Sequence, residues 1–232
     1  MANVTYQERR DALETYFDRT AVEAWAKLTS EAPVSGVRAT VRAGRDKIRD
    51  IFLDWSPDQM AGERVLDAGC GAGQLAFALA ARGAVVEAVD LSPTLLELAS
   101  ERAPRDLSGE VNFRAGDMLD PSGGPVDRVV AMDSLIHYGL DEMVQMLTGL
   151  ARRADQSIIF TFAPRTPALT VMHAAGKLFP KSDRSPAIIP VSERALRKRI
   201  AESAALADWR VARTERVDSF FYISQAMELV RA

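Results

Sequence analysis

The sequence predicts an α/β protein with a mostly parallel sheet and helices on both faces. The main observation is a regular alternation of short apolar runs and helical runs between residues 64 and 162. A second is a glycine-rich turn, Gly69 to Gly73, directly after the first apolar run. Parallel strands buried on both faces read as nearly continuous apolar runs, and they require helical crossovers. The alternation therefore predicts the fold class before any motif is considered.

The elements follow from the same pattern. Five strands are expected near residues 64–67, 84–89, 110–115, 126–132 and 156–162. Helices are expected near residues 73–82, 93–103 and 140–152, and a basic helix should begin after Ser192. Two further strands, at about 209–217 and 220–230, complete a seven-stranded sheet.

The regions outside this core predict additional elements. About 60 residues rich in helix formers precede the first strand, so we expect an N-terminal helical lid or extension, 1–60, and a ligand-binding domain, 61–232. Val37 to Leu53 predicts an amphipathic helix whose basic face is either a solvated surface or a lid. A proline-bracketed insertion after the fifth strand, at about 164–190, is long enough to form a substrate lid.

Composition excludes several classes of protein. A chain of 232 residues suits one domain with a sizeable core. The net charge of −3 argues against a nucleic-acid partner. Cys70 is the only cysteine, which excludes a disulfide framework and fits a reducing compartment. We expect a cytoplasmic protein, because no stretch approaches about 18 apolar residues and no secretory signal is apparent.

The turn Asp67-Ala68-Gly69-Cys70-Gly71-Ala72-Gly73 is the most informative stretch. Its glycines let a ligand approach the N–H groups at the start of a helix. Gly71-x-Gly73-x-x-Ala76 also fits a relaxed dinucleotide pattern, so a nicotinamide-dependent oxidoreductase is an alternative. Asp67 disfavours that alternative, because a carboxylate about 4 Å from a pyrophosphate charge would repel it by roughly 4 kcal/mol. S-adenosylmethionine carries an ammonium and a sulfonium instead, so the turn predicts a methyl-donor site.

Two more carboxylates follow successive strands. Asp90 ends the second strand about 20 residues beyond the glycines, where such folds present a carboxylate to a ribose diol. Asp117 follows the third strand and can accept from an adenine amino group, while Met118 can pack on the ring. Each alone could be an ordinary cap, turn or core residue, but three carboxylates at three strand ends favour one cofactor site. The predicted cofactor-binding residues are Asp67, Gly69, Cys70, Gly71, Gly73, Asp90, Leu91, Asp117, Met118 and Asp133.

The acceptor should lie at the end of the fourth strand. Open α/β sheets bind ligands at the carboxyl ends of their strands. The side chains from Asp133 to Tyr138 should therefore point toward the transferred methyl, and His137 and Tyr138 are the candidate catalytic residues. The other histidine, His173, lies in the insertion, where a structural role is equally consistent with the sequence. We expect Cys70 to be a small residue beside the cofactor without a nucleophilic role.

These motifs resemble those of class I S-adenosylmethionine-dependent methyltransferases over about residues 63–162. The resemblance rests on V-L-D-A-G-C-G-A-G (65–73), V-E-A-V-D (86–90), G-D-M (116–118) and D-R-V-V-A-M-D (127–133). It implies the Rossmann-like fold of that class.

The whole chain resembles the magnesium-protoporphyrin IX O-methyltransferases of (bacterio)chlorophyll biosynthesis. The matching residues are Tyr16-Phe17-Asp18-x-Thr20, Trp25, Arg42-x-Gly44-Arg45, Asp133-x-Leu135-Ile136-His137-Tyr138, Phe160-Thr161-Phe162-Ala163-Pro164 and Ser192-Glu193. One departure is that family members carry a tyrosine shortly after the Trp25 position, where this chain has Thr29-Ser30. No role of that tyrosine carries over.

The resemblance implies methylation of a porphyrin propionate by S-adenosylmethionine, which leaves S-adenosylhomocysteine. A carboxylic acid with a pKa near 4.3 is already ionised at neutral pH, so no general base is needed. His137 and Tyr138 would orient the propionate or fix the macrocycle. Magnesium belongs to the substrate, and its axial ligand could be His137, His173 or water. Tyr16, Phe17, Trp25 and His173 would contact the porphyrin.

The resemblance also implies partners. Magnesium protoporphyrin IX would be handed over by the large porphyrin-binding subunit of magnesium chelatase, and peripheral contact with an anionic photosynthetic membrane is compatible with the basic N-terminal helix. Two other functions remain open from the sequence. One is methylation of another small acceptor, such as a quinone or an amine. The other is a non-catalytic, cofactor-binding partner subunit.

Overall fold

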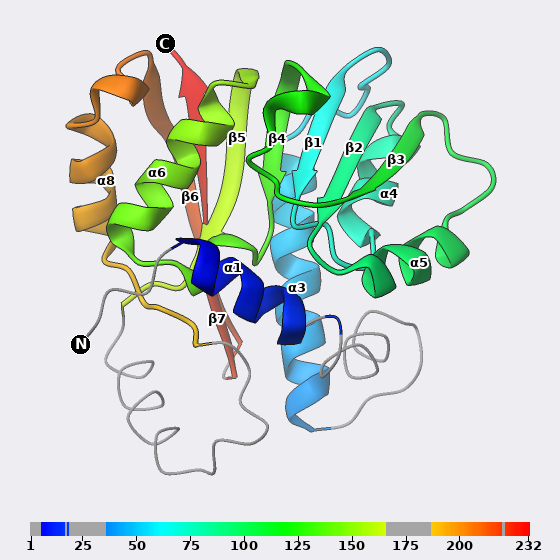
Figure 1. Ribbon diagram of the computed structural model, residues 1–232, viewed down its shortest axis with the longest axis horizontal. Helices are drawn as coiled ribbons and strands as arrows, with labels where there is room; N and C mark the ends of the chain where they lie inside the picture. The colour runs from blue at the N-terminus through cyan, green and yellow to red at the C-terminus, as the bar shows by residue number, and fades with distance from the viewer. Residues whose placement is uncertain (1–5, 17, 19–35, 166–186, 220) are drawn as a thin grey trace.

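A seven-stranded sheet forms the centre of the molecule (Figure 1). The computed structural model describes residues 6–16, 18, 36–165, 187–219 and 221–232. The strands are β1 Arg64–Ala68, β2 Val85–Asp90, β3 Glu110–Ala115, β4 Val126–Ala131, β5 Ala154–Phe162, β6 Trp209–Ser219 and β7 Tyr222–Arg231. They lie in the order β3-β2-β1-β4-β5-β7-β6. Among these described strands, β7 runs antiparallel to the other six. This confirms the predicted, mostly parallel sheet.

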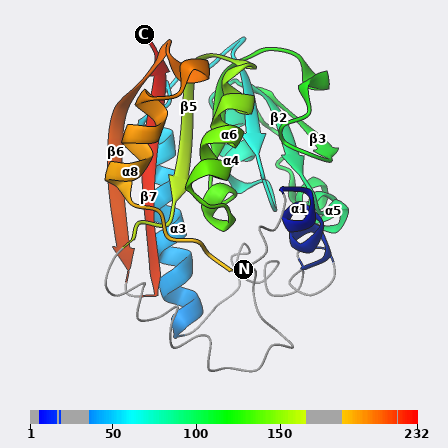
Figure 2. The same cartoon turned by 60° about the vertical axis from the view of Figure 1, so that its left-hand side comes forward.

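Helices cover both faces of this sheet. The described helices are α1 Tyr6–Thr15, α3 Val37–Asp54, α4 Gln74–Ala81, α5 Pro93–Arg102, α6 Leu140–Ala151 and α8 Glu193–Ala201. α6 and α8 lie on one face, and α3 and α4 lie on the other (Figures 1 and 2). Short 3-10 turns, η2 Pro121–Gly123, η3 Leu135–His137 and η5 Ala204–Leu206, complete the described elements. Among the described residues, no helix is long and apolar enough to cross a membrane.

The hydrophobic core has two parts, one on each face of the sheet. Leu147 of α6 and Leu196 of α8 belong to the first cluster, together with Phe160 of β5. Phe52 of α3 and Leu79 of α4 belong to the second. Because β1, β4 and β5 contribute side chains to both clusters, the central strands are buried on both faces, as their apolar sequences predict.

The predicted amphipathic helix is α3, and it is part of the layer that covers the sheet. Gly44, Ile48, Ile51 and Phe52 are its buried residues, and the helix lies against β6 and β7. α3 therefore packs directly on the C-terminal hairpin of the sheet, β6 and β7. The division of the chain at residue 60 stays a prediction.

α1 and the described ends of the insertion after β5 lie outside the layers that cover the sheet. α1 lies across the carboxyl ends of the parallel strands (Figure 1). Only the ends of the predicted insertion are described: Pro164 and Val191 form an isolated parallel bridge, and residues 166–186 lie outside the described residues.

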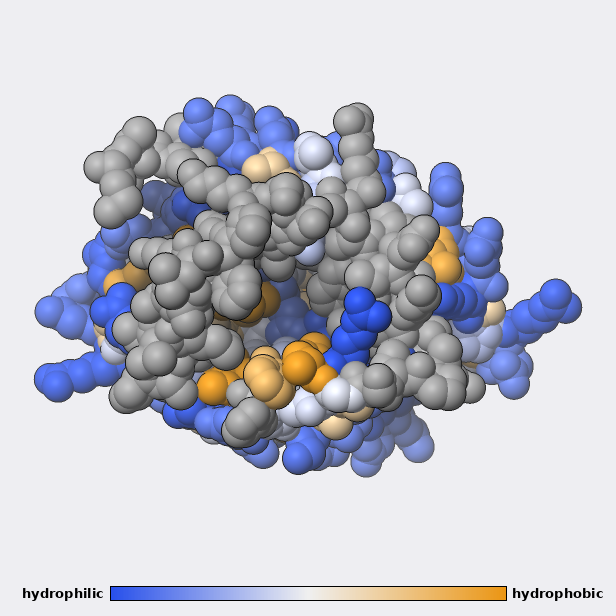
Figure 3. Space-filling model, turned by 90° about the horizontal axis from the view of Figure 1, so that it is seen from below, coloured by the Kyte–Doolittle hydropathy of each residue, from blue (hydrophilic) through white to orange (hydrophobic). Residues whose placement is uncertain are grey.

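The strand order positions the ligand site. From β1 the chain continues to β2 and β3 on one side, then returns to β4 on the other side of β1. Such a switch point leaves a crevice at the carboxyl ends of the strands, which is where ligands bind in open α/β sheets. Seen from below, the molecule is hollowed at this edge, and hydrophilic and hydrophobic residues share the hollow (Figure 3).

Candidate active site

The glycine-rich turn joins β1 to α4 and forms one wall of the hollow. Gly69 has a φ of +83°, and a Cβ there would lie 2.5 Å from the Ser134 Cβ, so only glycine fits between the turn and the chain after β4. The backbone N–H groups of Gly69 and Cys70 both donate to the Val89 carbonyl, at 2.8 and 3.0 Å. These contacts tie the turn to the end of β2.

Asp67 lies beneath this turn at the end of β1. Its side chain is buried, and it accepts a hydrogen bond from the Ala76 backbone. Among the described residues its Oδ2 has no hydrogen-bond partner. Burial, followed by the nearby charge of Asp90, raises the pKa of Asp67 to about 7. A buried carboxylate with an unpaired oxygen at a cavity fits a cationic group, such as the ammonium of a methionine moiety.

Asp90 faces the same cavity from the end of β2. Its Oδ2 accepts from the Gly71 N–H at 2.8 Å, and its Oδ1 accepts from the Ser92 N–H at 3.0 Å. Burial raises the pKa of this carboxyl group. The two backbone bonds hold the carboxylate still, and its remaining lone pairs fit the two hydroxyls of a ribose. Ser92 also caps α5, as its side chain accepts from the Leu95 N–H.

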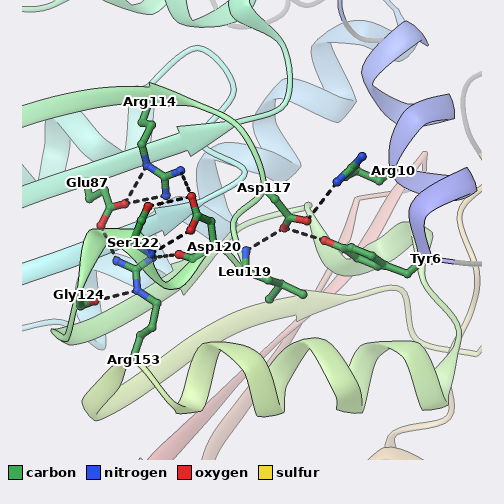
Figure 4. A network of polar contacts seen from close by, with 10 residues as sticks. All are labelled: Tyr6, Arg10, Glu87, Arg114, Asp117, Leu119, Asp120, Ser122, Gly124 and Arg153. Atoms are coloured by element: carbon green, nitrogen blue, oxygen red, sulfur yellow. Dashed lines mark hydrogen bonds and ion pairs between the residues drawn. The ribbon is translucent and has the colours of Figure 1, made fainter.

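Asp117 follows β3 and contacts α1, which the sequence analysis did not predict. Its Oδ1 accepts from the Leu119 N–H and from the Tyr6 hydroxyl, both at 2.8 Å, and Arg10 lies 3.6 Å from its Oδ2 (Figure 4). Tyr6 and Arg10 belong to α1. Burial and the contact with Asp117 raise the pKa of Tyr6, so its hydroxyl stays a donor. α1 therefore closes the adenine end of the predicted cofactor site.

A second polar network fixes the loop that carries Asp117. Glu87 of β2 accepts from Arg114 and Arg153, and Arg114 also contacts Asp120 at 3.1 Å (Figure 4). These guanidinium groups hold the pKa of Glu87 below its usual value despite partial burial. Arg153 donates to the Gly124 carbonyl at 2.8 Å as well. The described residues between β3 and β4 form only the short turn η2 Pro121–Gly123 instead of a crossover helix, and this network anchors that connection.

Asp133 follows β4 in a left-handed backbone conformation, with a φ of +59°. Its N–H donates to the Thr161 hydroxyl at 2.7 Å. Its carboxylate accepts from the Tyr222 hydroxyl, at 2.9 and 3.0 Å to its two oxygens, and forms an ion pair with Arg45 of α3. Four elements, α3, β4, β5 and β7, thus converge at this residue.

His137 and Tyr138 complete the acceptor end. Both are buried, with 7% and 1% of their surface exposed. The His137 Nδ1 lies 3.3 Å from the Ala187 carbonyl oxygen. Tyr138 stacks on Tyr6 with ring centroids 5.7 Å apart, and the Arg9 guanidinium lies 5.9 Å from the centre of the Tyr138 ring. Burial raises the pKa of Tyr138 and lowers that of His137, so both are neutral near pH 7.

One cavity collects most of the predicted site residues. Its lining includes Asp67, Gly69, Cys70, Gly71, Asp90, Leu91, Asp117, Met118, Asp133, His137 and Tyr138. Gly73 is not among the lining residues; it precedes α4 as its N-cap with a φ of +77°. Burial and the charges of Asp67 and Asp90 raise the pKa of the Cys70 thiol, which disfavours a nucleophilic thiolate.

The residues predicted to contact the porphyrin are not found in this cavity or are not described. Tyr16 follows α1, is half-buried and does not line the cavity. Phe17, Trp25 and His173 lie outside the described residues, as do Thr29 and Ser30. Sequence reasoning missed Tyr6 and Leu13 of α1, and it gave no role to Arg45, although Arg45 belongs to a quoted motif.

The strand order and the carboxylates at successive strand ends define a class I methyltransferase fold. A family model described as "Methyltransferase domain" matches residues 65–156, and one described as "Magnesium-protoporphyrin IX methyltransferase C-terminus" matches residues 131–231. A magnesium-protoporphyrin O-methyltransferase of Rhodobacter capsulatus is 48% identical over 96% of this chain and 97% of its own length. One from Synechocystis sp. is 32% identical over 94% of both chains.

A solved structure agrees with these relatives. The crystal structure of the magnesium protoporphyrin IX methyltransferase of Synechocystis, with bound S-adenosylhomocysteine, has a TM-score of 0.84 and 30% identity. The match covers 96% of this chain and 100% of that one. This chain belongs to the magnesium-protoporphyrin O-methyltransferase family.

Proposed function

We propose that this chain methylates a propionate carboxylate of magnesium protoporphyrin IX with S-adenosylmethionine, which yields the monomethyl ester for (bacterio)chlorophyll biosynthesis. The observation that carries the proposal is the 48% identity over 96% of the chain with a relative of that name. The acidic cavity supports it independently, because its carboxylates suit a cationic cofactor. A quinone acceptor has less support, since a ubiquinone biosynthesis O-methyltransferase of Xanthomonas campestris matches only 58% of this chain, at 30% identity.

We propose a described residue for each part of the cofactor. Asp67 would take the ammonium with its unpaired Oδ2. Asp90 would accept from the ribose hydroxyls, and Asp117 from the adenine amino group, with Met118 against the ring. A nicotinamide dinucleotide fits worse, since its pyrophosphate would lie near the carboxylate of Asp67 at the glycine-rich turn.

The chemistry requires little acid–base assistance. When bound, S-adenosylmethionine supplies an electrophilic methyl group, which the acceptor carboxylate takes from sulfur in one displacement that moves no proton. The C–O bond forms as the S–C bond breaks, and the electron pair stays on sulfur. The side chains therefore contribute by holding the two reactants about 3–3.5 Å apart in line and by excluding water.

His137 would either ligate the substrate's magnesium or orient its propionate, and the two roles need different ring protonation. A carbonyl oxygen only accepts hydrogen bonds, so the contact with Ala187 assigns the ring proton to Nδ1. With the pKa of His137 lowered by burial, the ring is neutral and Nε2 carries a lone pair. Ligation uses a ring nitrogen that carries a lone pair, and histidine ligands of metals usually donate their other N–H to a carbonyl or carboxylate, whereas orientation of a propionate needs an N–H directed at it.

The remaining partners belong to the proposal as well. Contacts of Tyr16, Phe17, Trp25 and His173 with the porphyrin stay predictions. Transfer of substrate from the large subunit of magnesium chelatase and contact with an anionic membrane rest on the resemblance alone. If adding that subunit changes neither the rate nor the apparent substrate affinity, the transfer idea fails. Sedimentation with anionic vesicles tests the membrane contact.

The function is tested by a methyl-transfer assay. Magnesium protoporphyrin should be converted to its monomethyl ester, while a quinone precursor and an amine at equal concentration should not react. Metal-free protoporphyrin serves as the matched acceptor without magnesium. Calorimetric titration with S-adenosylhomocysteine and with NAD separates the oxidoreductase alternative. A protein that binds S-adenosylhomocysteine but methylates none of the acceptors would support a non-catalytic partner subunit.

A further inference from the structure

Arg45 and Asp133 form a buried ion pair in the wall of the cavity. The Arg45 NH1 lies 2.5 Å from the Asp133 Oδ2, and only 13% and 7% of the two side chains are exposed. Both residues line the cavity, beside Ser134 and Met132. Buried ion pairs are costly to desolvate and contribute little net stability, so such a pair in a ligand site calls for a role beyond stability.

Independent contacts hold the pair in position. Thr161 accepts from the Asp133 N–H, and the Tyr222 hydroxyl donates to both carboxylate oxygens. Burial and the charge of Asp133 raise the pKa of Tyr222, so the phenol keeps its proton. The Tyr222 ring occupies the space that a Cβ on Gly44 would need, which explains the glycine before Arg45. α3 is thereby seated so that Arg45 meets Asp133.

The charge of the cavity gives this pair its significance. The described lining carries four carboxylates, those of Asp67, Asp90, Asp117 and Asp133, and Arg45 is its only lysine or arginine. Asp133 and His137 both lie in the segment that follows β4, at the predicted acceptor end. An anionic acceptor that enters there meets Asp133, and Arg45 is the group that cancels its charge.

Without Asp133, Arg45 would bind the acceptor carboxylate directly, and this would lower kcat. As a carboxylate takes a methyl group from a sulfonium, both charges are partly neutralised in the transition state and are gone in the ester and thioether products. A cation that binds the carboxylate directly therefore stabilises the ground state more than the transition state, which lowers kcat. The pair avoids this outcome, since Asp133 competes for the guanidinium.

We propose that Arg45 and Asp133 are a charge-balanced pair of positioning residues that adapts the acceptor end of the cavity to a carboxylate nucleophile. Arg45 neutralises Asp133 so that the anion can approach, and Asp133 keeps Arg45 from holding the anion too tightly. Thr161, Tyr222 and Gly44 fix the geometry of the pair. The inference rests on the proposed function, because it assumes an anionic acceptor.

The two partners should have opposite effects on steady-state kinetics. Arg45→Gln leaves the Asp133 charge unopposed, so KM for magnesium protoporphyrin should rise about tenfold with a smaller change in kcat. Asp133→Asn removes the carboxylate that competes with the acceptor for Arg45, so KM should fall or stay level while kcat falls about tenfold. The double variant Arg45→Gln/Asp133→Asn should recover much of both losses. Arg45→Lys, which keeps the charge, should stay closer to the wild type than Arg45→Gln.

Controls separate this role from a purely structural one. Arg49→Gln removes a charge one turn along α3, where Arg49 pairs with Asp46 outside the cavity, and it should leave kinetics unchanged. Calorimetry with S-adenosylhomocysteine reports whether each variant still folds around its cofactor site. If the losses in the double variant are additive, or if both single variants affect KM and kcat in the same way, the pair is only structural. If the wild-type protein does not methylate the porphyrin at all, the proposed function fails instead.

Discussion

Asp67 should make cofactor binding depend on pH. Its pKa is raised to about 7 in the ligand-free protein, because it is buried and lies near Asp90. A bound ammonium favours the ionised carboxylate, so binding below about pH 7 must displace a proton. Affinity for S-adenosylhomocysteine should therefore weaken as the pH falls below about 7, by up to tenfold per pH unit, and level off above it.

Calorimetry in buffers of different ionisation enthalpy measures the number of protons exchanged on binding.

The raised pKa of Asp67 has the opposite effect on the stability of the ligand-free fold. Between about pH 4 and 7 the folded protein keeps the Asp67 proton while the unfolded chain loses it, so stability falls as the pH rises toward about 7 and is regained toward about pH 4. Asp67→Asn should remove both effects and weaken binding above pH 7. Affinity that stays constant from about pH 8 to 5.5 would exclude Asp67 as the titrating group.

His137 is the second residue with a sharp expectation. His137→Ala should lower turnover strongly while affinity for S-adenosylmethionine stays nearly unchanged, since we place His137 at the acceptor end of the cavity and assign the cofactor groups to other residues. If Nε2 ligates magnesium, KM should rise about tenfold for the metallated porphyrin and little for metal-free protoporphyrin. Equal losses for the two porphyrins would support propionate orientation and contradict the tautomer assignment. Optical titration of the variant with each porphyrin reports the affinities directly.

At the scale of elements, local signals and distant contacts differ in what they reveal. Asp67 and Asp90 could be predicted because each follows a strand directly, and the glycine turn encodes its own geometry. The role of α1 could not. Tyr6 reaches Asp117 across 111 residues of sequence, and no periodicity records that contact. Asp18 is a similar case, because its carboxylate accepts from the Thr94 N–H and hydroxyl at the start of α5.

α1 should contribute to cofactor affinity through the Tyr6 hydroxyl. Tyr6→Phe keeps the ring that stacks on Tyr138 but removes the donor to Asp117. A hydrogen bond to a charged group is worth about 1.5–3 kcal/mol, but Leu119 still holds the carboxylate. We therefore expect affinity for S-adenosylhomocysteine to fall by about three- to tenfold, and Tyr6→Ala, which also loses the stacking, should bind more weakly. Affinity equal to the wild type for Tyr6→Phe would mean that Leu119 alone orients Asp117.

At the scale of the molecule, the cavity joins parts of the chain that are distant in sequence. Its lining draws on α1, α3, the ends of β1 and β2, and the segments after β3 and β4. The same α3 carries Arg45 to Asp133 and packs on the C-terminal hairpin, so the site and the antiparallel edge of the sheet share one helix. The strand order was predictable from the class of fold, whereas this sharing depends on side chains that meet only in space. A ligand in the cavity should consequently stabilise the whole fold.

The stabilisation should be specific to the cofactor. A ligand at about 100 times its Kd stabilises the native state by about 2.7 kcal/mol, which corresponds to roughly 5–10 °C in Tm for a chain of this size. S-adenosylhomocysteine should produce a shift of this order in calorimetric melting, and NAD at the same concentration should produce none, because Asp67 repels its pyrophosphate. Asp90→Ala should fold yet show a much smaller shift in Tm. The ribose hydroxyls would lack an acceptor, which weakens cofactor binding by about 1–3 kcal/mol. An equal shift with NAD, or an undiminished shift in Asp90→Ala, would contradict the assignment of the cavity.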